Sequence, residues 1–175
     1  MSNIERERIF LLKRLPPKLN SCKNIYIEIG DLTADNDVSL LKVRQKGDLF
    51  ELIKKETISK NERKEYVIPL NKEEFELLLK IAVRKHSKKR FFFPLNNYTC
   101  EIDVYLDDML GYVRAEVEFE TLEEMEDFVP PDWFGKEITE INHEIHKNLG
   151  TITFQTMLTR LKERSININK LTLKD

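Results

Sequence analysis

The chain has 175 residues, of which 41% are hydrophobic and 34% are charged, so it is long enough for one domain with its own core. Its 29 basic and 31 acidic side chains give a formal net charge of -2. This balance argues against a general binder of nucleic acid or membrane surfaces, which would carry an excess of basic residues. Two cysteines make neither a disulfide framework nor a metal-binding pair. No apolar run is long enough to span a bilayer and no signal peptide is evident, so we expect a cytoplasmic protein.

The first segment with a clear pattern runs from Ile4 to Leu12. It predicts a β-strand in which Glu5 and Glu7 point to the same side, with Ile9 next in that row. Two neighbouring carboxylates raise each other's pKa unless water or a cation relieves their repulsion. Mg²⁺ and Mn²⁺ prefer such oxygen ligands. The strand is therefore either the solvated edge of a sheet or one wall of a metal site.

The middle of the chain alternates between apolar and polar residues and is rich in β-branched and aromatic side chains, which is typical of strands. Strands are predicted at residues 25–29, 40–45, 49–55, 64–70, 99–106 and 112–119. A polar turn is expected at residues 30–36 and a charged loop at residues 56–63. A basic run at residues 84–90 leads into Phe91, which indicates that its end begins one more strand.

Helical spacing of apolar residues begins after Asn71, and Asn71 with Glu74 forms the pattern of an N-terminal cap. This helix is expected to end near Arg84. Further helices are predicted at residues 121–128, 140–148 and 153–164, and residues 166–173 suit an extra strand or an arm. Strands outnumber helices and have hairpin-scale connections. We therefore expect an α+β fold, in which an antiparallel sheet closes into a β-barrel with helices packed outside.

Several predicted strands carry charges of one sign at alternate positions, which places each pair on one face. These pairs are Glu5 and Glu7, Lys42 and Arg44, Lys88 and Arg90, Glu101 and Asp103, and Glu116 and Glu118. The residues between them are mostly apolar, so each strand has one ionic face and one dry face. Acidic and basic faces together suit a site that binds a polyanion through a divalent metal. The alternative is an ionic outer surface of a sheet.

At these positions the sequence resembles the CYTH superfamily, also called triphosphate tunnel metalloenzymes, which includes inorganic and thiamine triphosphatases and class IV adenylate cyclases. The resemblance runs from Ile4 to about Thr139. Its carriers, in order, are Ile4–Leu12, Lys42–Asp48, Glu51–Lys55, Glu65–Leu70, Lys88–Phe91, Glu101–Val104, Ala115–Phe119 and Pro130–Thr139.

The resemblance implies an eight-stranded antiparallel tunnel with the charged faces inside. The chain, residues 1–175, is then a single CYTH-like domain, with the C-terminal helix and tail at residues 151–175 peripheral. The implied cofactor is Mg²⁺ or Mn²⁺, held by Glu5, Glu7, Glu116 and Glu118. The residues implied to bind triphosphate are Lys42, Arg44, Lys55, Lys88 and Arg90. Glu65, Glu101 and Asp103 match further acidic tunnel positions, as metal ligands or as partners of the basic residues.

A catalytic role is implied for Tyr26, which matches the tunnel tyrosine that helps to orient the attacking water in triphosphatases of this family. Lys54 competes with Lys55 for the binding position, because a slip of one residue exchanges the two faces of a strand. The chain departs from the family pattern at three places. Ile9 replaces the lysine of the Glu-x-Glu-x-Lys motif, Val67 replaces a common carboxylate, and residues 140–143 replace an Asp-Lys-Arg run.

Three functions are consistent with these features. The first is a metal-dependent hydrolase of inorganic tripolyphosphate or an organic triphosphate. The second, suggested by Ile9, is a non-catalytic or weakened module that binds polyphosphate or a nucleotide. The third is a class IV adenylate cyclase, which is disfavoured because no feature for recognising a base is evident. In each case the partner is a small phosphate compound rather than nucleic acid or a membrane, and a homodimer stays open.

Two further patterns have simpler explanations. His143 and His146 stand three residues apart on a predicted helix, but zinc needs a third and usually a fourth ligand, and none is evident nearby. Trp133 and Phe134 follow two prolines, and we expect them to pack at the end of the barrel rather than to form an exposed binding patch.

Overall fold

The computed structural model of the chain describes residues 2–33, 39–58 and 62–173. The strands are β1 (Ser2–Leu12), β2 (Asn24–Asp31), β3 (Ser39–Lys46), β4 (Leu49–Thr57), β5 (Glu62–Leu70), β6 (Arg84–Leu95), β7 (Tyr98–Tyr105), β8 (Val113–Glu118) and β9 (Phe134–Glu137). The helices are α1 (Lys72–Lys80), α2 (Leu122–Asp127), α3 (Asn142–Ile145) and α4 (Phe154–Glu163). Parts of the turn expected at 30–36 and of the loop expected at 56–63 lie outside the described residues. None of the helices in the described ranges is long and apolar enough to cross a membrane.

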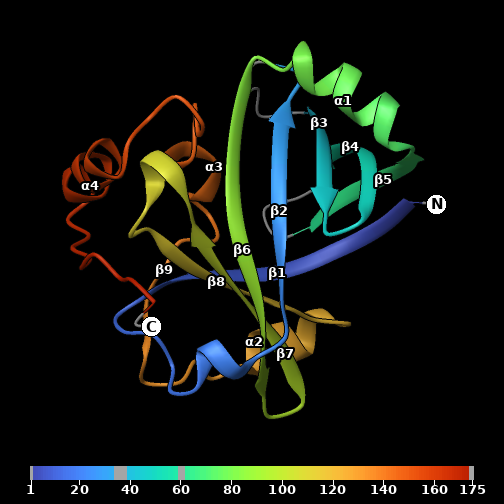
Figure 1. Cartoon of the computed structure of the whole chain (residues 1–175). Helices are drawn as coiled ribbons and strands as arrows, with labels where there is room; N and C mark the ends of the chain where they lie inside the picture. Colours follow the sequence, from blue (N-terminus) through green and yellow to red (C-terminus); the bar gives the residue numbers. More distant parts are fainter. Residues whose placement is uncertain (1, 34–38, 59–61, 174–175) are drawn as a thin grey trace.

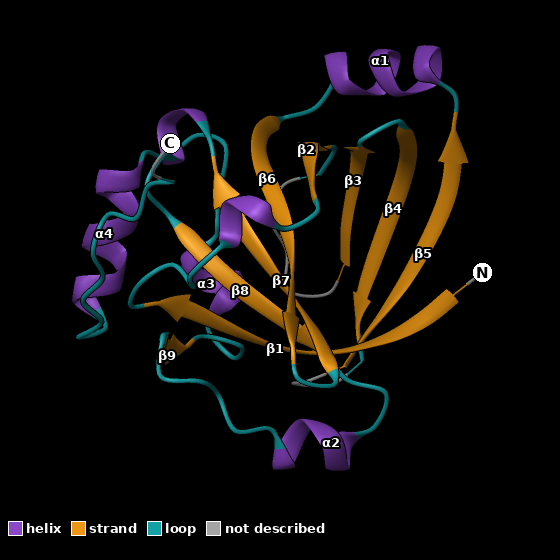
Figure 2. Ribbon diagram, turned by 60° about the horizontal axis from the view of Figure 1, so that its bottom comes forward, coloured by secondary structure: helices purple, strands orange, loops and turns teal. Residues whose placement is uncertain are grey.

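The strands form one antiparallel sheet of nine, in the order β5-β4-β3-β2-β6-β7-β8-β1-β9, and β5 also pairs with β1. Residues 2–6 of β1 pair with β5, and residues 7–11 pair with β8. Figure 2 shows how strongly the sheet curves. The expected α+β class and antiparallel sheet are thus confirmed, and β9 adds a strand beside β1 that we did not expect.

Two buried clusters stabilise the sheet, and β1 contributes to both because successive strand residues point to opposite faces. Phe10 and Leu12 belong to the first cluster, together with Trp133 and Phe134. Ile9 and Leu11 belong to the second. The expectation that the Trp-Phe pair packs inside rather than forming an exposed patch is confirmed.

The second cluster joins the sheet to the C-terminal helices (Figure 1). Ile145 of α3 and Met157 and Leu161 of α4 are completely buried in it, and Ile9 of β1 belongs to the same cluster. The expectation that residues 151–175 are peripheral therefore needs correction, because the described part of this segment supplies core side chains.

Other differences lie at short elements. The helix expected at 140–148 is the single turn α3, and α1 ends at Lys80 because β6 begins already at Arg84. Gly150 lies in the segment between α3 and α4, at a position that requires glycine. Its φ is +93°, and a Cβ there would lie 2.4 Å from the carbonyl oxygen of Lys85, so a side chain would be both strained and obstructed.

The role of α4 in the core can be tested by substitution. We expect Leu161→Ala to lower the free energy of unfolding by about 2–5 kcal/mol, because it removes a buried side chain and leaves a cavity. Leu77→Ala, at a residue that is 64% exposed on α1, is the matched control and should change it by less than about 0.5 kcal/mol. Urea unfolding measures both, and equal effects of the two changes would contradict a core role for α4.

Candidate functional site

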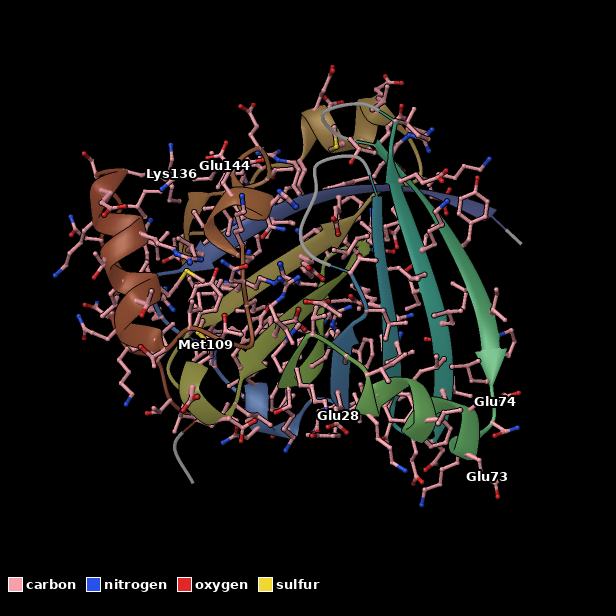
Figure 3. All side chains as sticks on the ribbon, turned by 90° about the horizontal axis from the view of Figure 1, so that it is seen from above. Glu28, Glu73, Glu74, Met109, Lys136 and Glu144 are labelled. Atoms are coloured by element: carbon pink, nitrogen blue, oxygen red, sulfur yellow. The ribbon has the colours of Figure 1, made fainter. Side chains whose placement is uncertain are left out.

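A cavity of about 320 Å³ is lined by residues of strands β1 to β8 and of α3. Its charged lining residues are Glu5, Glu7, Asp31, Lys42, Arg44, Lys46, Lys55, Glu65, Lys88, Arg90, Glu101, Arg114, Glu116 and Glu118. Figure 3 shows nitrogen-bearing and oxygen-bearing side chains crowded together in the interior of the curved sheet. The charged faces of the strands are therefore turned toward one another.

Most residues that the sequence singled out lie together in this cavity. Those lining it are Glu5, Glu7, Lys42, Arg44, Lys55, Glu65, Lys88, Arg90, Glu101, Glu116 and Glu118. Lys55 rather than Lys54 faces inward, since Lys54 is exposed and pairs with Glu56. This settles the question of register on β4.

Asp103 lies beneath the cavity and holds three cations. Its side chain is fully buried and accepts hydrogen bonds from Lys88, from Arg90 (Nε to Oδ1, 2.6 Å) and from Arg114 (Nη2 to Oδ2, 3.4 Å). Burial acts to raise its pKa, but the charges of Arg90, Lys88 and Arg114 outweigh it and hold the pKa well below its usual range. The ionised form of Asp103 is thus favoured, as a partner of the basic residues.

A second group of ion pairs lies on β1, β4 and β5. Lys55 Nζ is 2.6 Å from Glu5 Oε2 and 3.6 Å from Glu65 Oε1. Burial opposes the charge of Lys55, but Glu5, Glu7 and Glu65 together raise its pKa. On β3, Arg44 pairs with Glu51 at 2.7 Å. These cations are therefore paired with carboxylates of nearby strands.

Lys42 is different, because it has no ion pair with any described residue. Burial, followed by the neighbouring charges of Lys55, Arg44 and Lys88, lowers its pKa to about 7. Burial, and then Arg90, lowers the pKa of Lys88 to about 8 despite its pairing with Asp103. Burial and neighbouring cations thus disfavour the charged form of both lysines.

The acidic side shows the opposite imbalance around Glu118. Burial, and then the charges of Glu101, Glu5, Glu7 and Glu116, raise the pKa of Glu118 to about 7. Crowded carboxylates of this kind fit Mg²⁺ or Mn²⁺, which neutralise them and accept oxygen ligands. No three histidine, cysteine or acidic side chains in the described ranges are arranged to hold a metal ion, since Glu5 and Glu116 turn toward lysine and arginine. The donor set fits in chemistry and charge, while two of its members, Glu5 and Glu116, occupy ion pairs.

The placement of Tyr26 needs correction. Ile27 and Ile29 of β2 face the cavity, so Tyr26 lies on the opposite face of the same strand, where it is 45% exposed. The assignment rested on matching a motif and ignored the face on which the residue lies. The structure gives Tyr26 no access to the cavity.

The sequence analysis missed Arg114, which lines the cavity beside Glu116 at 2.5 Å. Its position two residues before Glu116 puts it in the same inward row, and this signal was overlooked because each strand was assumed to keep one sign of charge. His86, Tyr105 and Asn142 were missed as well. They are uncharged at neutral pH, so the search for charged pairs passed over them.

No family model matches the chain. The inorganic triphosphatase of Nitrosomonas europaea is 32% identical over 147 residues, which cover 83% of this chain and 96% of that protein. A crystal structure of an inorganic triphosphatase superposes with a TM-score of 0.62 at 29% identity, covering 83% of this chain and 93% of the other. A Bacillus halodurans protein named as a candidate adenylate cyclase has a TM-score of 0.54 at 16% identity, covering 99% and 95%, and shows a shared fold alone.

The inward-facing ionic rows follow the order that the sequence resemblance implies, and the similarity to the Nitrosomonas protein extends over nearly all of its length. The chain therefore belongs to the CYTH superfamily of triphosphate tunnel metalloenzymes.

Proposed function

We propose that the protein is a metal-dependent hydrolase of triphosphate compounds, which it binds inside a closed tunnel of strands β1 to β8. The observation that carries this proposal is the cavity itself, in which basic and acidic rows from all of these strands face each other. The similarity to an inorganic triphosphatase supports the same reaction. The pairing of β1 with both β5 and β8 supports the tunnel. Residues 1–175 act as one domain, and a small triphosphate is the partner.

In this proposal Mg²⁺ or Mn²⁺ is held by Glu5, Glu7, Glu116 and Glu118. When bound, the ion neutralises phosphate oxygens and polarises the phosphorus for attack. Glu65 and Glu101 are partners of the basic residues, as Asp103 is. Glu101 accepts a hydrogen bond from Arg90, and Glu65 lies near Lys55.

Lys42, Arg44, Lys55, Lys88 and Arg90 bind the phosphate chain. The ammonium group of lysine is a compact positive charge, and the guanidinium group of arginine can donate two parallel hydrogen bonds. Several such side chains in a row can therefore bind successive phosphates of a chain. Lys42 is the strongest candidate for a direct contact, because it has no described carboxylate to release. The reaction is attack of water on a terminal phosphorus, which breaks the bond from that phosphorus to the bridging oxygen and releases orthophosphate and the remaining diphosphate compound. These cations stabilise the charge on the phosphoryl oxygens.

A non-catalytic binding module is the second candidate, and Ile9 is the observation that favours it. Ile9 is 1% exposed and lies in the second apolar cluster rather than in the cavity lining. The row that begins with Glu5 and Glu7 thus ends without the motif lysine. Phosphate release from tripolyphosphate, ATP and thiamine triphosphate separates the two candidates, and metal-dependent binding without any turnover would establish the module instead.

The metal role can be tested at Glu118, whose ionised form is disfavoured by burial and by the neighbouring carboxylates. We expect Glu118→Gln to leave the metal-free protein as stable as before or more stable, because it removes repulsion, yet to lower metal-dependent phosphate release at least tenfold. Titration with Mg²⁺ and Mn²⁺ measures the effect. The control is Glu28→Gln, on the outer face of β2 (labelled in Figure 3), which should change neither property. Full activity of Glu118→Gln at low metal concentration would contradict the assignment.

The low pKa of Lys42 predicts proton uptake when triphosphate binds. At pH 8 the free side chain is mostly neutral, since its pKa is about 7, and a bound polyanion favours the charged form and raises that pKa. Calorimetric titration with tripolyphosphate in two buffers of different ionisation enthalpy measures the protons. Lys42→Arg keeps a charge that does not titrate, so it should take up fewer protons than the wild type, by up to about one. Equal uptake in both proteins would show that Lys42 does not meet the phosphates.

The surroundings of Ile9 predict the result of restoring the motif lysine. Ile9→Lys places an ammonium group among apolar side chains, and we expect it to destabilise the protein by about 2–5 kcal/mol without raising hydrolysis. Ile9→Met is the control for length without charge. A large gain of hydrolysis by the lysine variant would instead show that the inner row of β1 reaches the phosphates at this position.

A further inference from the structure

Arg114 of β8 lines the cavity, yet the proposed function so far gives it no role. Because strand residues alternate between two faces, Arg114 continues the inward row of Glu118 and Glu116. Strand pairing places Arg114 opposite Leu11 of β1. It places Glu116 opposite Ile9. The ionic row of β8 therefore extends one position beyond the point at which the row of β1 changes to hydrocarbon.

The guanidinium group of Arg114 lies among the proposed phosphate-binding residues. Its Nη2 is 3.4 Å from Asp103 Oδ2, and Lys88 Nζ and Arg90 Nη2 contact the same oxygen atom. Arg114 Cζ and Lys88 Nζ also each lie 5.8 Å from the centre of the Tyr105 ring. Groups that share one oxygen atom are close neighbours. A phosphate group bound by Lys88 and Arg90 would therefore be within reach of Arg114.

The contacts of Arg114 orient its guanidinium group. Nη1 donates to Asn142 Oδ1 at 3.0 Å, and Nη2 lies 2.5 Å from Glu116 Oε1. A side chain that is already held in place loses less conformational freedom when a ligand binds. Glu116 is also a proposed metal ligand. When Glu116 serves a bound metal, Arg114 loses this acceptor and its Nη2 group can donate to a phosphate oxygen instead.

Arg114 is also next to both places where the chain lacks the basic residues of the family pattern. Ile9, which replaces the motif lysine, lies diagonally across from it, two positions before Leu11 on β1. Residues 140–143 replace the Asp-Lys-Arg run, and Asn142 of this segment contacts Arg114 directly. Positive charge is thus absent at these two places and present on the strand that lies beside them.

We propose that Arg114 is a phosphate-binding residue, which supplies from β8 the positive charge that the chain lacks at Ile9 and at residues 140–143. It acts beside Lys88 and Arg90 on the phosphate chain. This inference rests on the proposed triphosphate site and adds to it a residue outside the family pattern. The loss of the motif lysine then moves a cation to another strand and does not remove it from the site.

The inference is tested by binding of tripolyphosphate in the absence of metal, measured by calorimetric titration. Arg114→Gln removes the charge and keeps a polar side chain, and we expect the affinity to fall about tenfold or more, because a charge-assisted hydrogen bond is lost. Arg114→Lys keeps the charge and should lose less. Equal affinities of Arg114→Gln and the wild type for tripolyphosphate would overturn the inference.

Titration with Mn²⁺ alone separates a binding role from structural damage. Arg114→Gln should bind Mn²⁺ at least as tightly as the wild type, because Glu116 loses a competing cation. The control is Arg8→Gln, on the outer face of β1, where Arg8 pairs with Glu137 at 2.7 Å and donates to two backbone carbonyl groups. It should lower the stability to urea and leave the affinity for tripolyphosphate unchanged. Weaker binding of both ligands by Arg114→Gln would indicate structural damage and overturn the inference.

The same titrations distinguish this inference from the proposed function. Tripolyphosphate binding that is weakened by Lys42→Gln but not by Arg114→Gln would overturn the role of Arg114 alone. Binding that depends on Arg114 without any release of phosphate would refute the hydrolase and support the inference. A wild-type protein that does not bind tripolyphosphate would refute both.

Discussion

The buried carboxylate of Asp103 is the interaction on which the rest of the site depends. Strand register places Asp103 directly opposite Arg90 on one side and Arg114 on the other. A slip of one residue in β7 would exchange it with Ile102 or Val104 and would leave charges facing the apolar cluster, so the ionic and apolar faces enforce the same register. Because the carboxylate is fully desolvated, it is tolerated only with all its cations in place, and its loss would leave Lys88, Arg90 and Arg114 without their shared anion.

This internal pairing constrains how ligands enter. Arg90 and Lys55 hold carboxylates that a metal would need, namely Glu116 and Glu5. A polyanion alone must compete with those carboxylates for the cations, and a metal ion alone must compete with the cations for the carboxylates. If both bind as proposed, each would release the groups that the other requires. The ion pairs across the cavity would therefore favour joint binding of metal and triphosphate over binding of either alone.

The alternation of charges along single strands was enough to predict the sheet and the inward direction of most site residues. The face to which a strand residue points depends only on its position along the strand. Glu5 and Glu7, or Lys42 and Arg44, need no tertiary information to share a face. The same alternation reveals the error at Tyr26. It precedes the inward-facing Ile27, so it points to the other face, and its role was assigned from resemblance alone. Short elements escaped prediction for the opposite reason. β9 has four residues and α3 a single turn, too few for any period, and both are specified by packing against β1. The neutral lining from α3 and β6 had no charge pattern to reveal it.

The inner row of β1 connects these observations. It runs from Glu5 and Glu7 to Ile9 and Leu11, and the change from carboxylate to hydrocarbon occurs where α3 and α4 cover the sheet. A lysine at position 9 would extend the ionic site toward the C-terminal helices, whereas isoleucine ends it there and keeps water away. Low local polarity beside fixed cations is what keeps His86 and His146 neutral. The departure from the family motif at Ile9 and the uncharged lining at α3 are thus two aspects of one boundary, at which the ionic lining of the cavity ends and the apolar cluster begins.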